Sequence, residues 1–374
     1  MAGIYIHIPY CKQKCHYCNF YSFASKQYRD HFVKVLLSEL TSRRDYLGDA
    51  AIGSIYFGGG TPSMLTPDEI NKILTHINND FQVDPHAEIT LEANPDDLDD
   101  EKLSSLKSTA INRLSIGVQS FFDDDLKYLN RVHDGDQAKQ SIELAGKHGF
   151  EKITIDLIYG IPTLTRKKWI ANLAQFFAFG ISHLSAYSLT VEPGTALQKL
   201  INRGRMKAVD EQQSIHHFKQ LLRLMRDHGY IHYEISNFAL KGHYSKHNSI
   251  YWVGGHYLGV GPSAHSFNGY SREWNVSNMR EYMESDTMEK KRKEREILSP
   301  EQQYNEYVMT SLRTSWGCDI GHITNVFGED RKTHFEQGVI PFLQEGKVRQ
   351  EGPKYYLTDK GKLYADGISS ELFI

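Results

Sequence analysis

The first two thirds of the chain repeat one pattern, in which a short apolar segment is followed by an amphipathic stretch. The apolar segments are rich in β-branched and aromatic residues, as is typical of strands. They are Ile4–Ile8, Ser54–Phe57, Glu88–Glu92, Leu114–Val118, Lys152–Ile158 and His183–Leu189. Six strand–helix units in succession predict a parallel sheet covered by helices, in an α/β fold that forms a partial, six-stranded (β/α) barrel.

Helices are predicted between these strands, near residues 27–46, 101–108, 137–148 and 167–179. The clearest helix start is Thr66-Pro67-Asp68-Glu69. Thr66 is a hydroxyl N-cap, proline occupies the first helical position, and Glu69 is placed to close a capping box. We therefore expect a helix that begins at Pro67.

Beyond Tyr270 the repeating pattern ends. The mixed charge run Glu289–Glu296 predicts a solvated helix or linker, and Ser299-Pro300-Glu301-Gln302 predicts a capped helix. An amphipathic stretch near 331–345, a hairpin over 348–357 and a last helix follow. We expect a barrel over residues 1–275, a charged linker over 276–298 and a mainly helical, winged-helix-like domain over 299–374. Because this last part has no clustered basic face, nucleic-acid binding is disfavoured.

Composition limits the classes of partner and compartment. The 43 basic and 46 acidic side chains give a net charge of −3, so no general attraction to nucleic acid is expected. Four cysteines in 374 residues form no disulfide framework, and the chain starts without a signal peptide. Both features predict a cytoplasmic protein. No stretch approaches the roughly 18 apolar residues of a membrane span.

Polar groups recur where the predicted strands end. In barrels the active site gathers at the carboxyl ends of the strands. The groups found there are the cysteines after the first strand, Gly58–Pro62 after the second, Glu92–Pro95 after the third, Gln119 after the fourth and Tyr187 near the end of the sixth, with Asp156 inside the fifth. The sequence therefore predicts one site at this rim.

Three cysteines follow the first strand, in the spacing C-x3-C-x2-C at Cys11, Cys15 and Cys18. Thiolates bind zinc or iron–sulfur clusters, and a zinc site or a four-iron cluster takes four ligands. Cys318 is far away in the sequence, so a cluster here would keep one iron without a protein ligand. Two alternatives remain: buried thiols on one helix face, and a zinc site with His16 as fourth ligand.

The glycine run and Glu92 are candidate ligand contacts. Gly58–Gly60 lack side chains, so a ligand can approach the bare backbone amides, although a tight turn would also explain the run. The stretch lacks the Gly-Lys-Ser/Thr ending of a phosphate loop, which disfavours nucleoside triphosphates. Glu92 could accept hydrogen bonds from both hydroxyls of a ribose, the alternative being a solvated charge in an acidic region.

A second candidate stretch is Lys246-His247-Asn248-Ser249-Ile250-Tyr251-Trp252. The imidazole of His247 can bind haem iron, and Tyr251 and Trp252 offer flat faces to a macrocycle. A histidine near aromatic residues is also common as a structural residue. From residue chemistry alone both interpretations stay open.

The cysteine spacing, with an aromatic residue before the last cysteine, resembles the cluster loop of the radical S-adenosylmethionine superfamily. This resemblance implies a [4Fe-4S] cluster whose open iron binds S-adenosylmethionine. The order of site residues is similar, over nearly the whole chain, to the oxygen-independent coproporphyrinogen III oxidase family. It implies that Tyr5, Gly59 and Glu92 contact S-adenosylmethionine, and that Tyr17, Gly60, Thr61, Gln119, Arg131 and Asp156 surround a second cofactor or substrate region. No residue is assigned as catalytic.

The chain differs from the oxidases in two features, and in both it resembles the HemW branch of that family. The oxidases have a further cysteine where this chain has Phe20, and they extend before the first strand. The stretch around His247 also matches the H-N-x-x-Y-W signature of the HemW branch. The resemblance implies a haem chaperone, with His247, Tyr251 and Trp252 at the haem, that hands haem to acceptor haemoproteins such as respiratory-chain proteins.

The alternatives are a radical decarboxylase acting on coproporphyrinogen and a zinc-stabilised interaction protein. Oxidase activity is not expected. A monomer and a cluster-dependent homodimer both stay open, as does peripheral contact with a membrane.

Overall fold

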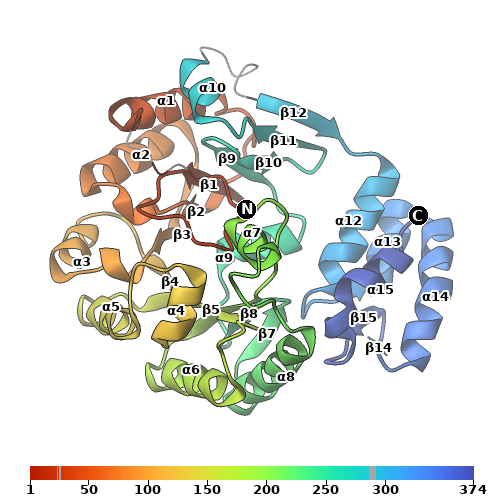
Figure 1. Cartoon of the computed structure of the whole chain (residues 1–374). Helices are drawn as coiled ribbons and strands as arrows, with labels where there is room; N and C mark the ends of the chain where they lie inside the picture. The colour runs from red at the N-terminus through yellow and green to blue at the C-terminus, as the bar shows by residue number, and fades with distance from the viewer. Residues whose placement is uncertain (23, 25–26, 286–291) are drawn as a thin grey trace.

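The computed structural model describes residues 1–22, 24, 27–285 and 292–374. Six adjacent parallel strands form its centre, and helices lie around their outer side (Figure 1). The strands are β1 (Ala2–Ile8), β2 (Ile52–Gly59), β3 (Val83–Ala93), β4 (Arg113–Gln119), β5 (Lys152–Tyr159) and β6 (His183–Ser188). They are the six strands that the sequence predicts, and they pair in sequence order. The predicted α/β fold and barrel core are confirmed.

The helices that connect these strands agree closely with the sequence pattern. They are α1 (Arg29–Ser42), α2 (Pro67–Asp80), α3 (Asp100–Leu106), α4 (Asp123–Leu129), α5 (Gly135–Lys147) and α6 (Arg166–Ala178). Helix α2 begins at Pro67, as predicted. Thr66 Oγ1 accepts from the backbone N–H of Glu69, and the Glu69 carboxylate accepts from the backbone N–H of Thr66 at 2.7 Å. This reciprocal pair satisfies two helix N–H groups and fixes the helix start.

The strands alternate between an apolar outer face and a polar inner face. In β1, Ile4, Ile6 and Ile8 are buried in the hydrophobic core, whereas Tyr5 and His7 line the interior of the barrel. Each of β2–β6 does the same, because successive side chains of a strand point to opposite faces. The polar inner faces enclose a cavity instead of a packed apolar core. This arrangement positions the site.

The described strands extend the sheet well beyond the barrel, in the order β12-β11-β10-β9-β1-β2-β3-β4-β5-β6-β8-β7. The added strands are β7 (Ile231–Glu234), β8 (Asn237–Ala239), β9 (Tyr257–Val260), β10 (His265–Phe267), β11 (Ser271–Asn275) and β12 (Arg292–Ile297). Strand β9 is parallel to β1, and β8 is antiparallel to β6. The sequence analysis did not predict these six strands.

Strand β12 corrects the expectation of a solvated helix or linker at Glu289–Glu296. Residues 292–297 pair antiparallel with β11, and the earlier part of the run lies outside the described residues. Arg295 forms an ion pair with Glu273 of β11 at 3.3 Å. Opposite charges on paired strands stabilise the edge strand β12. Without its partner strand, the same sequence has the charge pattern of a solvent-exposed segment.

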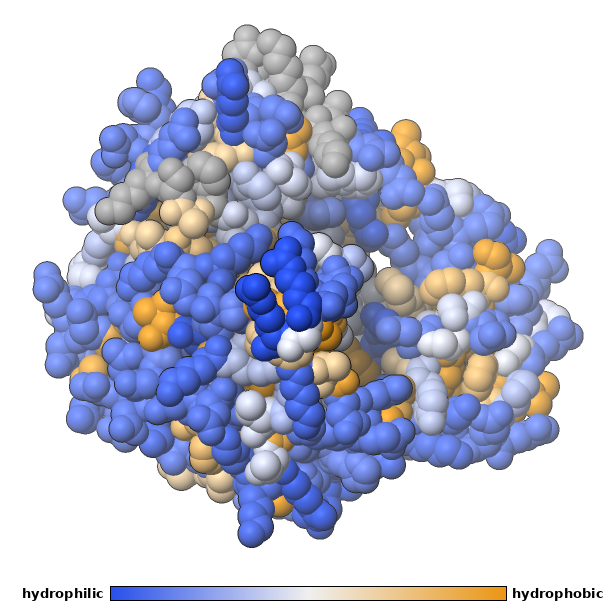
Figure 2. Space-filling view, viewed as in Figure 1, coloured by the Kyte–Doolittle hydropathy of each residue, from blue (hydrophilic) through white to orange (hydrophobic). Residues whose placement is uncertain are grey.

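The C-terminal part has its own small core and lies beside the barrel (Figure 1). Its elements are α12 (Pro300–Leu312), β13 (Cys318–Asp319), α13 (Ile320–Phe327), α14 (Glu329–Gln344), β14 (Val348–Glu351), β15 (Lys354–Leu357), the 3₁₀ helix η3 (Gly361–Tyr364) and α15 (Ala365–Glu371). The capping box at Ser299 and the hairpin of β14 and β15 are confirmed. Figure 2 shows a mostly hydrophilic face that is hollowed between this part and the barrel.

Four further α-helices are α7 (Ala196–Asn202), α8 (Glu211–Asp227), α9 (Lys246–Trp252) and α10 (Met279–Glu284), and two short 3₁₀ helices are η1 (Pro62–Met64) and η2 (Pro95–Asp97). Helix α8 contacts the C-terminal part through an ion pair between Arg226 and Asp359 at 2.8 Å. None of the helices in the described residues combines the length and the apolar character that crossing a membrane requires.

Candidate functional site

Two cavities adjoin each other along the barrel. The outer cavity, about 770 Å³, lies at the carboxyl ends of the strands, and the inner cavity, about 560 Å³, lies between the polar strand faces. Both volumes fall within the range of about 300–1,000 Å³ that is typical of small-molecule sites. Six residues line both cavities: Asn19, Phe20, Glu92, Ser115, Asp156 and Tyr187. A ligand in one cavity would therefore share a wall with a ligand in the other.

The three cysteines line the outer cavity, in the loop that follows β1. All three are free and partly exposed, so they are not buried thiols on a helix face. Arg131 donates a hydrogen bond from Nη1 to Cys15 Sγ at 3.3 Å, and Gly60 lies close to Cys11 Sγ. Burial raises the pKa of Cys11 and of Cys18, so binding an iron would have to displace a proton from each thiol.

These thiols fit an iron–sulfur cluster, because three soft ligands face one cavity beside a cationic side chain. Among the described residues, no group of three or more His, Cys, Asp or Glu side chains is close enough to hold a single metal ion. His16 hydrogen-bonds through Nδ1 to the carbonyl oxygen of Tyr128 at 3.2 Å, and it is not among the residues that line the outer cavity.

The glycine run brings the end of β2 against the cysteine loop. Gly59 has a φ of +114°, and a Cβ there would lie 2.6 Å from the ring of His7. A Cβ at Gly60 would lie 2.6 Å from the carbonyl oxygen of Tyr10 and 3.0 Å from Cys11 Sγ. Both positions require glycine, since a side chain at Gly59 would displace the ring of His7 and a side chain at Gly60 would push the cysteine loop away from the strand.

Glu92 lies between the two cavities and is held in place from two sides. Tyr56 donates its hydroxyl proton to Oε1 at 2.8 Å, and the backbone N–H of Gly59 donates to Oε2 at 3.1 Å. Burial raises the pKa of Glu92. These contacts rule out the alternative of a solvated surface charge, and they orient the carboxylate for a ligand at the strand ends.

The remaining residues predicted for the rim gather around the outer cavity. Arg131 donates from Nη2 to Asn94 Oδ1 at 2.6 Å and to the carbonyl oxygen of Gly117 at 2.8 Å. Asn94 in turn donates to Thr61 Oγ1 at 3.2 Å. Tyr17 and Gln119 also line this cavity. Tyr5 is placed differently, because it lines the inner cavity and hydrogen-bonds to His7 Nδ1 at 3.1 Å.

Asp156 lines both cavities and faces Glu92. Burial, together with the nearby charge of Glu92, raises the pKa of Asp156 to about 7. The folded protein therefore keeps a proton on this carboxyl at pH values where the unfolded chain, with a pKa near 3.8, has lost it. This difference in protonation makes the free energy of unfolding fall as the pH rises from about 4 to about 7.

Replacing Asp156 by asparagine should remove this pH dependence. We expect wild type to lose about 1–3 kcal/mol of stability relative to Asp156→Asn between pH 5 and pH 8, because only wild type must ionise a buried carboxyl. Denaturant unfolding of both proteins at the two pH values measures the difference. Equal losses in the two proteins would show that Asp156 ionises normally.

The segment around His247, on helix α9, lines the inner cavity. His247 is 2% exposed. Its Nδ1 hydrogen-bonds to Ser54 Oγ and its Nε2 to the hydroxyl of Tyr251, both at 2.9 Å. Burial lowers the pKa of His247 to about 3, so the imidazole is neutral. Tyr251 is 37% exposed and lines the same cavity.

Trp252 is not brought to this cavity with its two neighbours in the motif. Its indole Nε1 is buried and has no hydrogen-bond partner among the described residues. Helical geometry accounts for the difference, because residues four apart share a face of a helix and adjacent residues do not. The structure therefore joins His247 and Tyr251 and leaves Trp252 on another side of α9.

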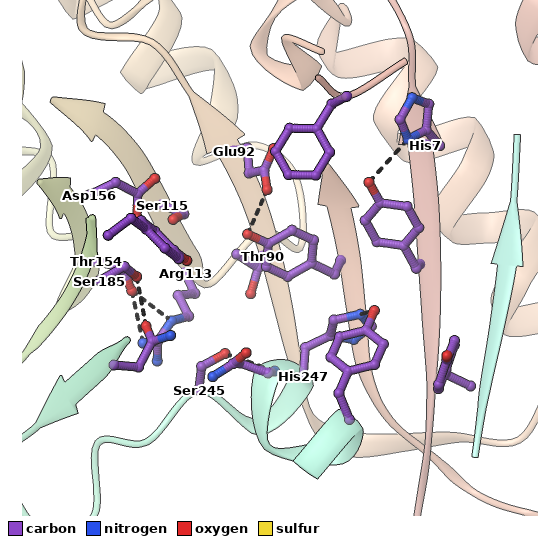
Figure 3. A pocket seen from close by; sticks show the side chains of 18 of the residues that line it. His7, Thr90, Glu92, Arg113, Ser115, Thr154, Asp156, Ser185, Ser245 and His247 are labelled. Carbon is purple, nitrogen blue, oxygen red and sulfur yellow. Dashed lines mark hydrogen bonds between the residues drawn. The ribbon is translucent and has the colours of Figure 1, made fainter. Parts of the chain in front are cut away.

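Sequence reasoning missed most residues of the inner cavity. Figure 3 shows side chains of neighbouring strands pointing into one space, with Arg113, Thr154 and Ser185 among them. Arg113 pairs with Glu88 at 3.2 Å and donates to Thr154 Oγ1 at 2.9 Å. The available signal was the alternation within each strand, because polar residues two apart, such as Arg113 and Ser115, occupy its inner face.

Comparisons with known proteins point to one family over nearly the whole chain. The family model described as "Radical SAM superfamily" matches residues 5–176, and the "HemN C-terminal domain" matches residues 298–364. "Heme chaperone HemW" of Bacillus subtilis is 34% identical over 373 residues, covering 98% of both chains. The protein of that name from Lactococcus lactis is 32% identical, covering 96% of this chain and 93% of its own.

Two further comparisons concern a mitochondrial relative and the fold. The mouse mitochondrial "Radical S-adenosyl methionine domain-containing protein 1" is 33% identical over 74% of this chain and 64% of its own length. The solved structure of coproporphyrinogen III oxidase (HemN) from Escherichia coli superposes with a TM-score of 0.86. It covers 100% of this chain and 90% of that chain at 23% identity, which shows a common fold.

Proposed function

Because this chain belongs to the HemW family of haem chaperones, within the radical S-adenosylmethionine superfamily, we propose that it binds haem in the inner cavity and hands it to acceptor haemoproteins. One observation carries the proposal: the segment His247–Tyr251 faces a cavity of about 560 Å³ inside the barrel. Tyr5, Tyr56 and Tyr257 also line this cavity, and their flat rings suit a macrocycle.

The outer cavity is proposed to hold a [4Fe-4S] cluster and S-adenosylmethionine. Cys11, Cys15 and Cys18 would bind three irons. Gly59 and Glu92 would contact S-adenosylmethionine there, and Tyr5 would face it from the inner cavity. A second cofactor or substrate region would be surrounded by Tyr17, Gly60, Thr61, Gln119, Arg131 and Asp156. When bound, these groups supply one-electron chemistry. The chain itself contributes the cation of Arg131 beside Cys15 and the carboxylate of Glu92, which its two hydrogen bonds hold in position.

The alternative function is oxidative decarboxylation of coproporphyrinogen III. The chaperone is favoured because the full-length relatives of known name are haem chaperones, whereas the oxidase is similar at only 23% identity. Phe20, which stands where the oxidases have a further cysteine, is 66% exposed and lines both cavities. An apolar ring at the junction of the two cavities can contact a bound ligand, but it cannot take part in redox chemistry as a cysteine could.

An assay with coproporphyrinogen III separates the two functions. The anaerobically reconstituted and reduced protein, with S-adenosylmethionine, should form no divinyl product. A coproporphyrinogen oxidase of the HemN type, given the same substrate batch, is the positive control. The haem-loaded protein should instead restore haem to an apo-haemoprotein, followed by the absorbance of the acceptor. Formation of the divinyl product would contradict the chaperone proposal.

The proposal also covers the domain organisation, the cellular location and the oligomeric state of the protein. Separate hydrophobic clusters support a division between a barrel domain and a C-terminal domain over 299–374. The segment proposed as a connection, 276–298, packs Met279 and Tyr282 into the barrel core and adds β12 to its sheet. We place the protein in the cytoplasm, with respiratory-chain haemoproteins among its acceptors. A monomer and a cluster-dependent homodimer are distinguished by sedimentation with and without the cluster.

A further inference from the structure

Resting on the proposed cluster in the outer cavity, we propose that Lys12 neutralises two carboxylates beside the cysteine loop and thereby raises the reduction potential of the cluster. The carboxylates belong to Asp96 and Asp97, in η2 at the end of β3. Lys12 directly follows Cys11 in the sequence, and it is not among the residues that line either cavity. It would therefore act through charge, from outside the ligand site.

Lys12 contacts both carboxylates of η2. Its Nζ lies 3.0 Å from Asp96 Oδ2, and it also forms an ion pair with Asp97 Oδ1. The side chain of Lys12 is 44% exposed, whereas those of Asp96 and Asp97 are 10% and 7% exposed. Burial alone would lower the pKa of Lys12, but its hydrogen bonds to Asp97 and Asp96 raise it. Two nearly buried carboxylates are thus paired with one cation from the cysteine loop.

A second cation, Lys102, lies near Asp97 but makes its hydrogen bond elsewhere. Lys102 Nζ donates to the carbonyl oxygen of Leu65 at 2.6 Å. Asp97 also accepts a hydrogen bond from Ser63 Oγ at 2.7 Å, which fixes the carboxylate without neutralising its charge. Among the described residues, Lys12 is therefore the cation that forms ion pairs with both carboxylates.

The charge of Asp96 acts on the cysteines through Arg131. Arg131 donates a hydrogen bond to Cys15 Sγ at 3.3 Å. Burial would lower the pKa of Arg131, but its interactions with Tyr17, Cys15 and Asp96 raise it. Partly buried charges are screened little by salt. If Lys12 did not neutralise Asp96, this carboxylate would offset the guanidinium, and the thiolates would experience a less positive potential.

The cysteine loop is also anchored independently of the Lys12 side chain, by the end of helix α4. Gln13 Nε2 donates to the carbonyl oxygen of Asn130 at 3.0 Å. Asn130, the C-cap of α4, donates from Nδ2 to the carbonyl oxygen of Lys14 at 2.9 Å. These bonds do not involve the ammonium group, so they remain when Lys12 is replaced. The charge of Lys12 can therefore be tested separately from the shape of the loop.

The sign of the effect follows from the charge that reduction adds. An electron from the reductant makes a cluster bound by three thiolates more anionic by one unit. The reduction potential of an iron–sulfur cluster depends on the net charge around it. Carboxylates that lack a cation oppose the added electron, so the potential falls. Removing the charge of Lys12 should therefore make the cluster harder to reduce.

The test is a redox titration with dithionite, followed by electron paramagnetic resonance, of anaerobically reconstituted wild type and variants. At the midpoint potential of wild type, Lys12→Met should show a ratio of reduced to oxidised cluster that is about tenfold lower. Lys12→Arg should match wild type, because it keeps the charge. The triple variant Lys12→Met, Asp96→Asn, Asp97→Asn should return to the wild-type ratio or exceed it, because neither carboxylate is left.

Lys139 in α5 provides the matched control. Its Nζ forms an ion pair with Asp136 at 2.9 Å, and its side chain is 39% exposed, close to the value for Lys12. Neither Lys139 nor Asp136 is among the residues that line the outer cavity. Lys139→Met removes the same charge from a similarly exposed ion pair, and it should leave the ratio unchanged.

Three results would decide against the proposal. An unchanged ratio in Lys12→Met, or a lowered ratio that the triple variant retains, would overturn the inference. Loss of the cluster in Lys12→Met would overturn it as well, because Lys12 would then be needed to hold the loop. If wild type takes up no iron and sulfide, the proposed cluster itself fails. Iron and sulfide analysis of the wild-type protein therefore separates the two failures.

Discussion

Replacing Cys18 by alanine should leave a folded protein that no longer retains a four-iron cluster. After anaerobic reconstitution we expect iron and sulfide in wild type near the content of one cluster per chain, and close to none in Cys18→Ala. The reason is the ligand count: with only two thiolates left in the loop, two irons would lack a protein ligand. Iron and sulfide analysis and the broad visible absorbance of the cluster measure the effect.

Cys318 offers the matched control for this variant. It is fully buried in the C-terminal core, away from the outer cavity. Cys318→Ala should keep the full cluster and lose only about 1 kcal/mol of stability from the missing sulfur contacts. A full cluster in Cys18→Ala, or a lost cluster in Cys318→Ala, would mean that the ligands are assigned wrongly.

Replacing Gly59 by alanine should have the second large effect. The φ of +114° is unfavourable for any residue with a Cβ, and the added carbon would lie 2.6–2.9 Å from three ring atoms of His7. We expect a loss of about 2–4 kcal/mol in the free energy of unfolding, from backbone strain and the displaced ring together. Binding of S-adenosylmethionine to the reconstituted protein should weaken as well, because Gly59 N–H holds the carboxylate of Glu92.

Gly146 in α5 is the control for the glycine substitution. A Cβ at Gly146 would have nothing within 4 Å. Gly146→Ala should therefore stabilise the protein by about 0.5–1 kcal/mol, because alanine favours the helix over the unfolded chain. Denaturant unfolding measures both variants, and equilibrium dialysis measures the cofactor. If Gly59→Ala behaves like Gly146→Ala, the tight contact between β2 and His7 does not exist in solution.

Local signals were enough to predict the core of the fold. The six barrel strands and the helix starts at Pro67 and Pro300 were found because each has a pattern that is complete within a few residues: an apolar run, or a capping box. The added strands β7–β12 were missed because several are only three to five residues long. Such short runs show no clear alternation of apolar and polar residues, and the pairing of β9 with β1 and of β8 with β6 joins segments that are distant in sequence.

The site was predicted at its rim and missed in its interior. Cys11, Gly59 and Glu92 stand at strand ends, where barrel topology predicts that they should meet. The inner cavity depends on the alternate residues of six different strands, such as Tyr5 and Arg113, and on α9 reaching beneath them. The burial of His247 and its hydrogen bonds to Ser54 and Tyr251 are tertiary properties that the motif alone does not reveal.

Titration of the purified protein with ferric haem tests the central claim most directly. We predict saturation at one haem per chain, with a sharp Soret band and an affinity that persists through gel filtration. A titration that rises without saturation, or a spectrum identical to that of free haem in buffer, would contradict the account, since the inner cavity would then not be a haem site.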